Sequence, residues 1–277
     1  MASIRQKYFE IAKLQSEYLP KNVIYELLIL TNEFSFQNEL FLHFDDECKN
    51  EELLGRYIKD ILEGVPFQYV VSKSHFCGLD FYVDKNVLIP RPETEELVLL
   101  ATKTIKDKFK NNDLNIIDVC TGSGCIAISL KKYFGEASVF ASDISEGAIS
   151  VAKQNSEKLN LNIEVLQGNL MEPVLNKGIK FDVIISNPPY IPSKETVSEQ
   201  TLKYEPHLAL FAFPSTKYYE EIFIQSQNVI HNDTCFFFEI GEDMEEYLAP
   251  LVEKYFPNKE YKFIKDMYNK TRFLFII

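Results

Sequence analysis

The feature that most constrains the fold is an alternation of short apolar runs with helix-like segments, which begins at about residue 92. Strands that are joined through a helix run parallel in one sheet, with helices on both faces. Seven runs have strand character: Asn115–Val119, Ser138–Ser142, Ile163–Leu166, Phe181–Ser186, Thr234–Ile240, Tyr261–Ile264 and Thr271–Ile277. The last two have no helix between them, which predicts a terminal hairpin with one antiparallel strand. We therefore expect an α/β fold with a doubly wound, mostly parallel, seven-stranded sheet.

The first third of the chain has a different pattern. Apolar residues recur at helical spacing from residue 3 to about 63, and the aromatic-rich segment from Phe76 to Val87 alternates like a β-hairpin. Pro92 and the acidic residues after it favour a helix that runs to about Lys110. We expect a helical domain over residues 1–75, a hairpin linker over 76–91 and the α/β domain over 92–277.

Composition narrows the class of protein. Lys and Arg number 29 against 41 Asp and Glu, a net charge of −12, which argues against direct nucleic-acid binding through phosphates. The five cysteines form no C-x-x-C pair and the four histidines are scattered, so no metal site is expected. No apolar run reaches membrane-spanning length. The expectation is a cytoplasmic, monomeric protein.

A turn of small residues follows the first predicted strand. Cys120, Thr121, Gly122, Ser123 and Gly124 would let the backbone approach a ligand at the carboxyl end of the sheet. The turn differs from the dinucleotide pattern because Ala occupies the third glycine position, although the alanine keeps a nicotinamide fold formally open. It also differs from a phosphate-binding P-loop, since no Gly-Lys-Ser/Thr follows.

Two further positions suit a nucleoside. Asp143 follows the second strand, 25 positions after Asp118, where a carboxylate can accept hydrogen bonds from both ribose hydroxyls. Its alternative role is to cap the helix that starts near Ser145. Asn169 and Leu170 follow the third strand and could contact an adenine ring, although the segment also suits an ordinary turn.

The strongest local signal is Asn187-Pro188-Pro189-Tyr190, at the end of the fourth strand. The prolines fix φ and remove two N–H donors. The Asn187 side-chain oxygen and a proline carbonyl can then accept both N–H bonds of a planar NH₂ group, while Tyr190 offers a flat face for stacking. Such acceptors turn the nitrogen lone pair toward an electrophile and stabilise the charge that develops on methylation, so no strong base is needed.

These motifs resemble class I, Rossmann-like S-adenosylmethionine-dependent methyltransferases that act on nitrogen. Adenine methyltransferases of DNA and guanine methyltransferases of RNA share the Asn187–Tyr190 motif. Three further segments resemble the peptide chain release factor glutamine methyltransferases, as does the short run Phe238–Gly241. These segments are Gly64–Tyr69, Leu88–Glu95 and Tyr204–Leu210.

The resemblance implies transfer of a methyl group to the glutamine of the Gly-Gly-Gln motif in class 1 release factors, with S-adenosylhomocysteine as product. Residues 120–124 and Asp143 would bind S-adenosylmethionine, and Asn169, Leu170 and Asn187 would complete that site. Asn187, Pro188 and Tyr190 would be catalytic, Asn187–Tyr190 would hold the glutamine, and the helical domain would dock the release factor. The alternative is a nucleic-acid N-methyltransferase that acts on adenine in DNA or guanine in rRNA.

The chain departs from the family pattern at three places. Cys120 replaces a usual glycine, Asn169 replaces a usual aspartate, and residues 211–216 replace a glycine-rich segment. None of these changes alters the two acceptors of the Asn187–Tyr190 motif, so an active enzyme is expected.

Overall fold

The computed structural model of the protein describes residues 2–110 and 113–277. The chain divides into two compact units, Met1–Ser72 and Lys73–Ile277, and each is described by itself.

The first unit is helical. Ser3 begins its first helix with a reciprocal capping box, and Asn50 caps its fourth helix. Its core is an apolar cluster that includes Ile4, Leu27 and Leu54. The helices are α1 (Ile4–Ala12), α2 (Lys21–Asn32), α3 (Gln37–Leu42), α4 (Glu51–Leu62) and the single turn α5 (Phe67–Val70).

The second unit is built on the sheet that the sequence predicts. Its described residues form a seven-stranded sheet of order β5-β4-β3-β6-β7-β9-β8, in which only β9 runs antiparallel to its neighbours. The doubly wound, mostly parallel fold and its terminal hairpin are therefore confirmed. The strands are β3 (Asn115–Val119), β4 (Ser138–Asp143), β5 (Glu164–Gln167), β6 (Phe181–Ser186), β7 (Ile230–Glu239), β8 (Tyr261–Lys265) and β9 (Thr271–Ile276).

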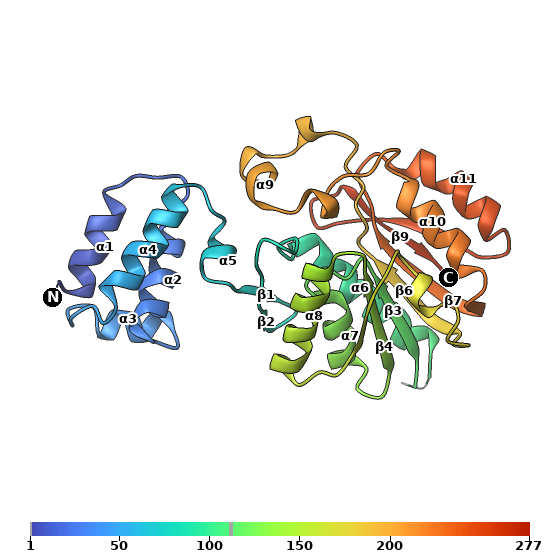
Figure 1. The fold of residues 1–277 in the computed structure, drawn as a ribbon, viewed down its shortest axis with the longest axis horizontal. Coiled ribbons are helices and arrows are strands. Elements are labelled where there is room, and N and C mark those ends of the chain that lie inside the picture. The colour runs from blue at the N-terminus through green and yellow to red at the C-terminus, as the bar shows by residue number, and fades with distance from the viewer. Residues whose placement is uncertain (1, 111–112) are drawn as a thin grey trace. The chain divides into compact units, whose positions relative to one another are not determined.

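Helices cover both faces of this sheet (Figure 1). One face carries α6 (Pro92–Lys108), α7 (Cys125–Tyr133) and α8 (Glu146–Leu159), and the other carries α10 (Lys217–Ser226) and α11 (Glu245–Tyr255). The short elements are η1 (Glu172–Val174), η2 (Lys194–Thr196), α9 (Glu199–Tyr204) and η3 (His207–Ala209).

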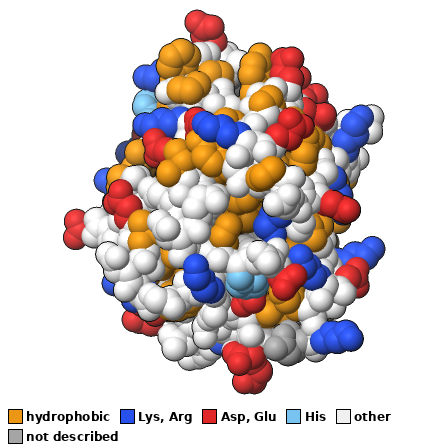
Figure 2. Space-filling model, turned by 90° about the vertical axis from the view of Figure 1, so that its right-hand side faces the viewer, with side chains coloured by type: hydrophobic (Ala, Val, Ile, Leu, Met, Phe, Trp, Pro, Cys, Tyr) orange, Lys and Arg blue, Asp and Glu red, His pale blue; other side chains and the backbone are white. Residues whose placement is uncertain are grey.

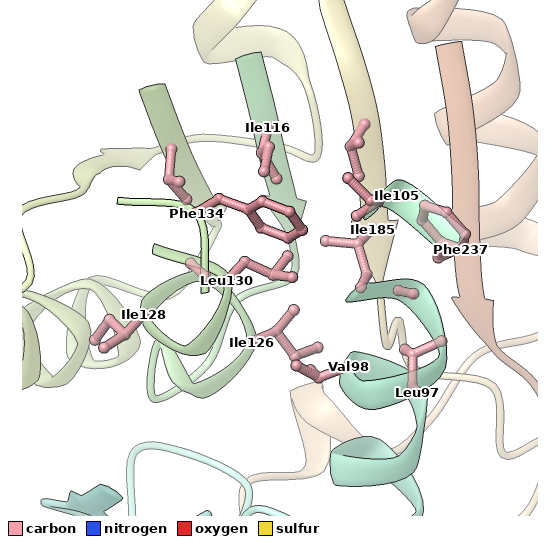
Figure 3. Packing of buried hydrophobic residues seen from close by; sticks show 14 of the residues in the cluster. Leu97, Val98, Ile105, Ile116, Ile126, Ile128, Leu130, Phe134, Ile185 and Phe237 are labelled. Atoms are coloured by element: carbon pink, nitrogen blue, oxygen red, sulfur yellow. The ribbon is translucent and has the colours of Figure 1, made fainter. Parts of the chain in front are cut away.

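Alternating side chains explain why the strands are apolar throughout. Successive residues of a strand point to opposite faces, so a strand covered on both sides needs apolar residues at every position. In β6, Ile185 packs with α6 and α7 in the cluster of Figure 3, whereas Ile184 packs in the cluster on the opposite face. In β7, Phe237 belongs to the first cluster, and its neighbours Phe236 and Phe238 belong to the second.

The hairpin lies earlier in the chain than the sequence indicates. Its strands are β1 (Ser74–Phe76) and β2 (Leu79–Phe81), and the expected continuation to Val87 is wrong. Cys77 and Gly78 join them with φ of 47° and 68°, the left-handed pair that suits a two-residue hairpin turn. Phe76 and Phe81 pack into the core of the second unit.

Removing the Phe237 ring will test the core. Phe237 has no exposed surface, and its ring meets Phe275 edge-on at a centroid distance of 4.7 Å. Phe237→Ala is expected to lower the free energy of unfolding by about 3–5 kcal/mol, because a buried cavity replaces the ring. Phe213→Ala is the control, since that side chain is 84% exposed and its loss is expected to change stability little. Equal effects in urea denaturation would contradict this packing.

Candidate active site

The register of the parallel strands sets the position of the site. Val119 at the end of β3 pairs with Ser142 of β4 and with Ser186 of β6. Ser186 also pairs with Phe238 of β7 and donates a hydrogen bond to the Val119 carbonyl over 2.5 Å. The residues that follow these strand ends therefore meet at one edge of the sheet, where doubly wound folds bind ligands.

The side chain of Asp118, in β3, holds the small-residue turn that follows this strand. This buried carboxylate accepts hydrogen bonds from the Thr121 hydroxyl at 2.5 Å and from the Ala127 N–H at 3.2 Å. Burial raises the pKa of Asp118 to about 7, against the opposing effect of both hydrogen bonds. Its role is to fix the turn and the start of α7.

The turn itself uses left-handed backbone. Cys120, Gly122 and Gly124 have φ of 63°, 55° and 80°, so a non-glycine residue at Cys120 is accommodated at some conformational cost. Gly124 also allows α8 to approach, because a Cβ there would lie 3.3 Å from the Ala152 Cβ. On the far side, the buried Asn155 of α8 donates to the Ser123 carbonyl at 2.9 Å.

Asp143 faces this turn across the strand ends. One carboxylate oxygen accepts from the Gly122 N–H and the other from the Ser145 N–H, each at 2.9 Å. The N-cap of α8 is Ser145, whose hydroxyl accepts from Ala148, so the alternative reading of Asp143 as the cap is wrong. Burial raises the pKa of Asp143, and the backbone hydrogen bonds oppose that rise.

A single cavity of about 340 Å³ gathers most of the predicted residues. Small-molecule sites commonly occupy roughly 300–1,000 Å³. Among the described residues, its lining includes the predicted positions Cys120, Thr121, Gly122, Ser123, Asp143, Asn169, Leu170, Asn187 and Pro189. Gly124, Pro188 and Tyr190 are the predicted positions outside that lining.

Asn187 connects the cavity to a buried series of hydrogen bonds. Its side-chain NH₂ donates to the Thr94 hydroxyl at 3.0 Å, and Thr94 donates to the Glu239 carboxylate at 2.6 Å. The Tyr190 hydroxyl donates to the other Glu239 oxygen at 3.3 Å. Tyr190 thus contacts Glu239 through its hydroxyl, an arrangement that the predicted stacking role did not include.

Sequence reasoning also missed the buried carboxylate of Glu205, which lies next to the cavity residue Pro206 in the sequence. Glu205 accepts hydrogen bonds from the Arg91 guanidinium at 2.5 Å and from the Ile89 N–H at 3.2 Å. It thereby ties the segment before α6 to the segment after α9. The motifs that contain Arg91 and Glu205 were recognised as family segments, but their separation of 114 positions hid the contact.

The cavity also has a wall that the motifs did not indicate. Lys217, Tyr218 and Glu221 of α10 line it, as do Pro206, Leu208 and Ala209. Residues 211–216 connect this wall to α10, and Phe211 forms a parallel bridge with Ile191. Among the described residues, no group of three or more His, Cys, Asp or Glu side chains is placed to hold a metal ion.

Known proteins resemble the chain over nearly its whole length. A family model for the methyltransferase small domain matches residues 98–204. The release factor glutamine methyltransferase of Bacillus subtilis is 36% identical over 275 residues, which cover 95% of each chain. That of Staphylococcus aureus is 39% identical and covers 85% of each chain. The chain belongs to the release factor glutamine methyltransferase family. The family that the sequence motifs indicated is thus confirmed, and the chain is an enzyme of the methyltransferase class.

Solved structures agree at the level of the fold. A methyltransferase from Pyrococcus furiosus superposes with a TM-score of 0.53 at 20% identity, covering 72% of this chain and 88% of that one. A 16S rRNA guanine methyltransferase from T. thermophilus gives 0.55 at 15% identity, covering 74% and 49%. At such identities the likeness extends to the class I methyltransferase fold alone.

Gly124→Ala will test the turn in this family member. The residue has φ of 80°, and an added Cβ would lie 3.1 Å from the Ile128 side chain. Left-handed backbone costs an L-residue about 1–2 kcal/mol, so the free energy of unfolding is expected to fall by at least that amount. Gly135→Ala is the matched control, because no atom lies within 4 Å of its added Cβ. A thermal melt in which Gly124→Ala behaves like the control would contradict the conformation of the turn.

Proposed function

We propose that the protein transfers a methyl group from S-adenosylmethionine to the side-chain amide nitrogen of the glutamine in the Gly-Gly-Gln motif of class 1 peptide chain release factors. One observation carries the proposal beyond family membership. Asn187 lines the same cavity as Asp143 and the small-residue turn, so the acceptor for an amide and the place for a nucleoside adjoin. The Thr94 contact occupies the Asn187 NH₂ group and leaves its oxygen for a substrate.

The residues of the cavity suit S-adenosylmethionine, the methyl donor of class I methyltransferases. The left-handed turn at Cys120–Gly124 lets backbone approach the ligand, and Asp143 offers carboxylate lone pairs beyond its two backbone contacts. Leu170 gives an apolar surface for the adenine, with Asn169 beside it. When bound, S-adenosylmethionine supplies an electrophilic methyl group.

The chain's own residues would orient and polarise the amide. The Asn187 oxygen and the Pro188 carbonyl would accept the two N–H bonds, which turns the nitrogen lone pair away from both acceptors. As positive charge develops on nitrogen, the same oxygens stabilise it. Pro189 lines the cavity beside them. Tyr190, with its hydroxyl on Glu239, would hold this corner in place and present its ring edge or face to the glutamine.

A nucleic-acid substrate is the alternative that remains to be compared. The net charge of −12 disfavours a phosphate-rich partner. On the face shown in Figure 2, Lys and Arg side chains lie interspersed with Asp and Glu, so their fields partly cancel. The rRNA methyltransferase shares the fold with this chain at 15% identity, whereas relatives named for release factors reach 39%. The protein substrate is therefore favoured.

The helical unit would supply a docking surface for the release factor. Its described residues expose large apolar side chains, of which Phe36 before α3 and Leu42 at its end are 74% and 83% accessible. No described helix is long and apolar enough to cross a bilayer. The monomeric state and cytoplasmic location expected from composition stay predictions.

Mass spectrometry of a release factor will test the activity. Incubation with enzyme and S-adenosylmethionine is expected to add one methyl group to the Gly-Gly-Gln peptide. Asn187→Ala is expected to lower the rate by about 100-fold or more, since the loss of a preorganised acceptor commonly costs a factor of roughly 10²–10³. Label in rRNA or DNA, with none in the release factor, would contradict the proposal.

Calorimetry will test the role of Asp143. Asp143→Ala is expected to weaken S-adenosylmethionine binding by about 3- to 100-fold, through lost hydrogen bonds worth about 1–3 kcal/mol. Asp143→Asn keeps one oxygen that can accept from the Ser145 N–H but removes the negative charge. Comparison of the two variants therefore distinguishes a loss of ribose hydrogen bonds from a disturbed turn. Unchanged affinity in both variants would exclude the ribose role.

A further inference from the structure

Asn187 and Thr94 line the cavity, and a series of hydrogen bonds runs from Asn187 through Thr94 to the buried Glu239. The chemistry described above uses the Asn187 oxygen but gives Thr94 and Glu239 no part in selecting it. The members of this series come from the loop after β6, the first turns of α6 and the end of β7. The two contacts span 93 and 145 positions of sequence, so only the fold brings the groups together. Thr94 is 3% exposed and Glu239 is 3% exposed, which makes both contacts hard to replace with water.

When Glu239 is ionised, the direction of each hydrogen bond in the series Asn187–Thr94–Glu239 is fixed. A carboxylate has no proton, so it only accepts hydrogen bonds. The Thr94 hydroxyl has a single proton and must direct it to Glu239, at 2.6 Å. Its remaining lone pairs can then only accept, and the group at 3.0 Å that can donate to them is the Asn187 NH₂.

This order has a consequence at the cavity. A side-chain amide can rotate by half a turn, which would exchange its oxygen and its NH₂ group at almost no steric cost. With the NH₂ directed to Thr94, the oxygen is the atom left for a substrate. With the amide reversed, two donors would face the N–H bonds of the incoming glutamine and repel them.

We propose that Thr94 and Glu239 are positioning residues that select the rotation of the Asn187 amide and so make this site an acceptor of NH₂ groups. The inference rests on the proposed methyl transfer to an amide nitrogen and names the groups that set its specificity. Thr94 and Glu239 act through Asn187 and need not touch the substrate.

The surroundings of Glu239 make the rotation of the Asn187 amide sensitive to pH. The charged and titratable groups around the carboxylate are Glu93 of α6, Arg272 of β9, Tyr190, and Tyr219 of α10, whose hydroxyl donates to the Glu239 backbone carbonyl. Burial is the largest influence and raises the pKa of Glu239 to about 7, while Thr94, Arg272 and Tyr190 oppose it. Below that pH the carboxyl gains a proton and can donate, so Thr94 is no longer obliged to direct its own proton to Glu239.

Three variants separate positioning from packing. Thr94→Val removes the hydroxyl at nearly equal volume, and Thr94→Ser restores it. Thr102→Val is the matched control, because Thr102 is a buried threonine of the same helix whose hydroxyl has no partner among the described residues. With a release factor as substrate, Thr94→Val is expected to lower kcat/KM by about 10- to 100-fold, and the other two variants by less than about threefold.

The binding of S-adenosylmethionine is expected to stay within about twofold of wild type in all three variants, because Thr94 acts on the amide acceptor. Equal activity of Thr94→Val and wild type would overturn the proposal. So would a Thr94→Ser variant as impaired as Thr94→Val, since that result would assign the effect to the lost methyl group.

The pH profile tests Glu239. In the wild type, kcat/KM is expected to fall as the pH is lowered through about 7, in keeping with protonation of the buried carboxyl. Glu239→Gln cannot gain this proton, so its activity is expected to be lower by about tenfold at pH 8 and flat across that range. An acid limb that persists unchanged in Glu239→Gln would overturn the role of Glu239.

A measurement without turnover keeps the inference separate from the proposed function. The Asn187 side-chain NH₂ gives a pair of NMR signals, which their absence in Asn187→Asp identifies. The proton bonded to Thr94 is expected downfield and slow to exchange, and Thr94→Val is expected to move it upfield while Thr102→Val leaves it in place. An unchanged Asn187 pair in Thr94→Val would overturn the inference. If instead the pair shifts and no release factor is methylated, the proposed function alone fails.

Discussion

The parallel register of β3 with β4 and β6 is the constraint on which the rest of the molecule depends. Pairing of Val119 with Ser142 and Ser186 brings the ends of three neighbouring strands to one edge of the sheet. Each end then opens into a loop whose groups need partners, because backbone and carboxylates there are withdrawn from water. The loops supply hydrogen-bond partners to one another, and the cavity is the space left between them.

Buried carboxylates hold these loops, and none of them belongs to the motif that suggests the chemistry. Asp118 fixes the turn after β3, and Glu239 fixes Thr94 and Tyr190. Burial raises the pKa of each to about 7, because the charged form of a carboxyl group is disfavoured away from water. Hydrogen bonds to each carboxylate offset part of this penalty and fix the groups that donate them, so these residues contribute to the enzyme by orienting others.

Several features could be predicted from the sequence because their causes are local. Apolar residues at every position of Phe181–Ser186 indicate a strand covered on both faces, and the glycines at 122 and 124 indicate a turn with unusual φ. The hairpin position was wrong because the left-handed pair Cys77–Gly78, which determines it, includes a residue that rarely takes positive φ. Similarly, Asp and Ser are both favoured caps, so the choice of Ser145 over Asp143 depended on the path of the chain.

The sequence by itself determined the class of fold, the family and two parts of the site, the turn Cys120–Gly124 and the motif Asn187–Tyr190. Each of these depends on strand periodicity or on residue types within a few consecutive positions. Only the tertiary structure decided which distant groups form hydrogen bonds with the residues around the site. Arg91 meets Glu205 across 114 positions, and Thr94 meets Glu239 across 145. Such contacts leave no periodic trace in the chain, because a hydrogen bond between distant segments depends on the register of the sheet and the packing of α6 against it.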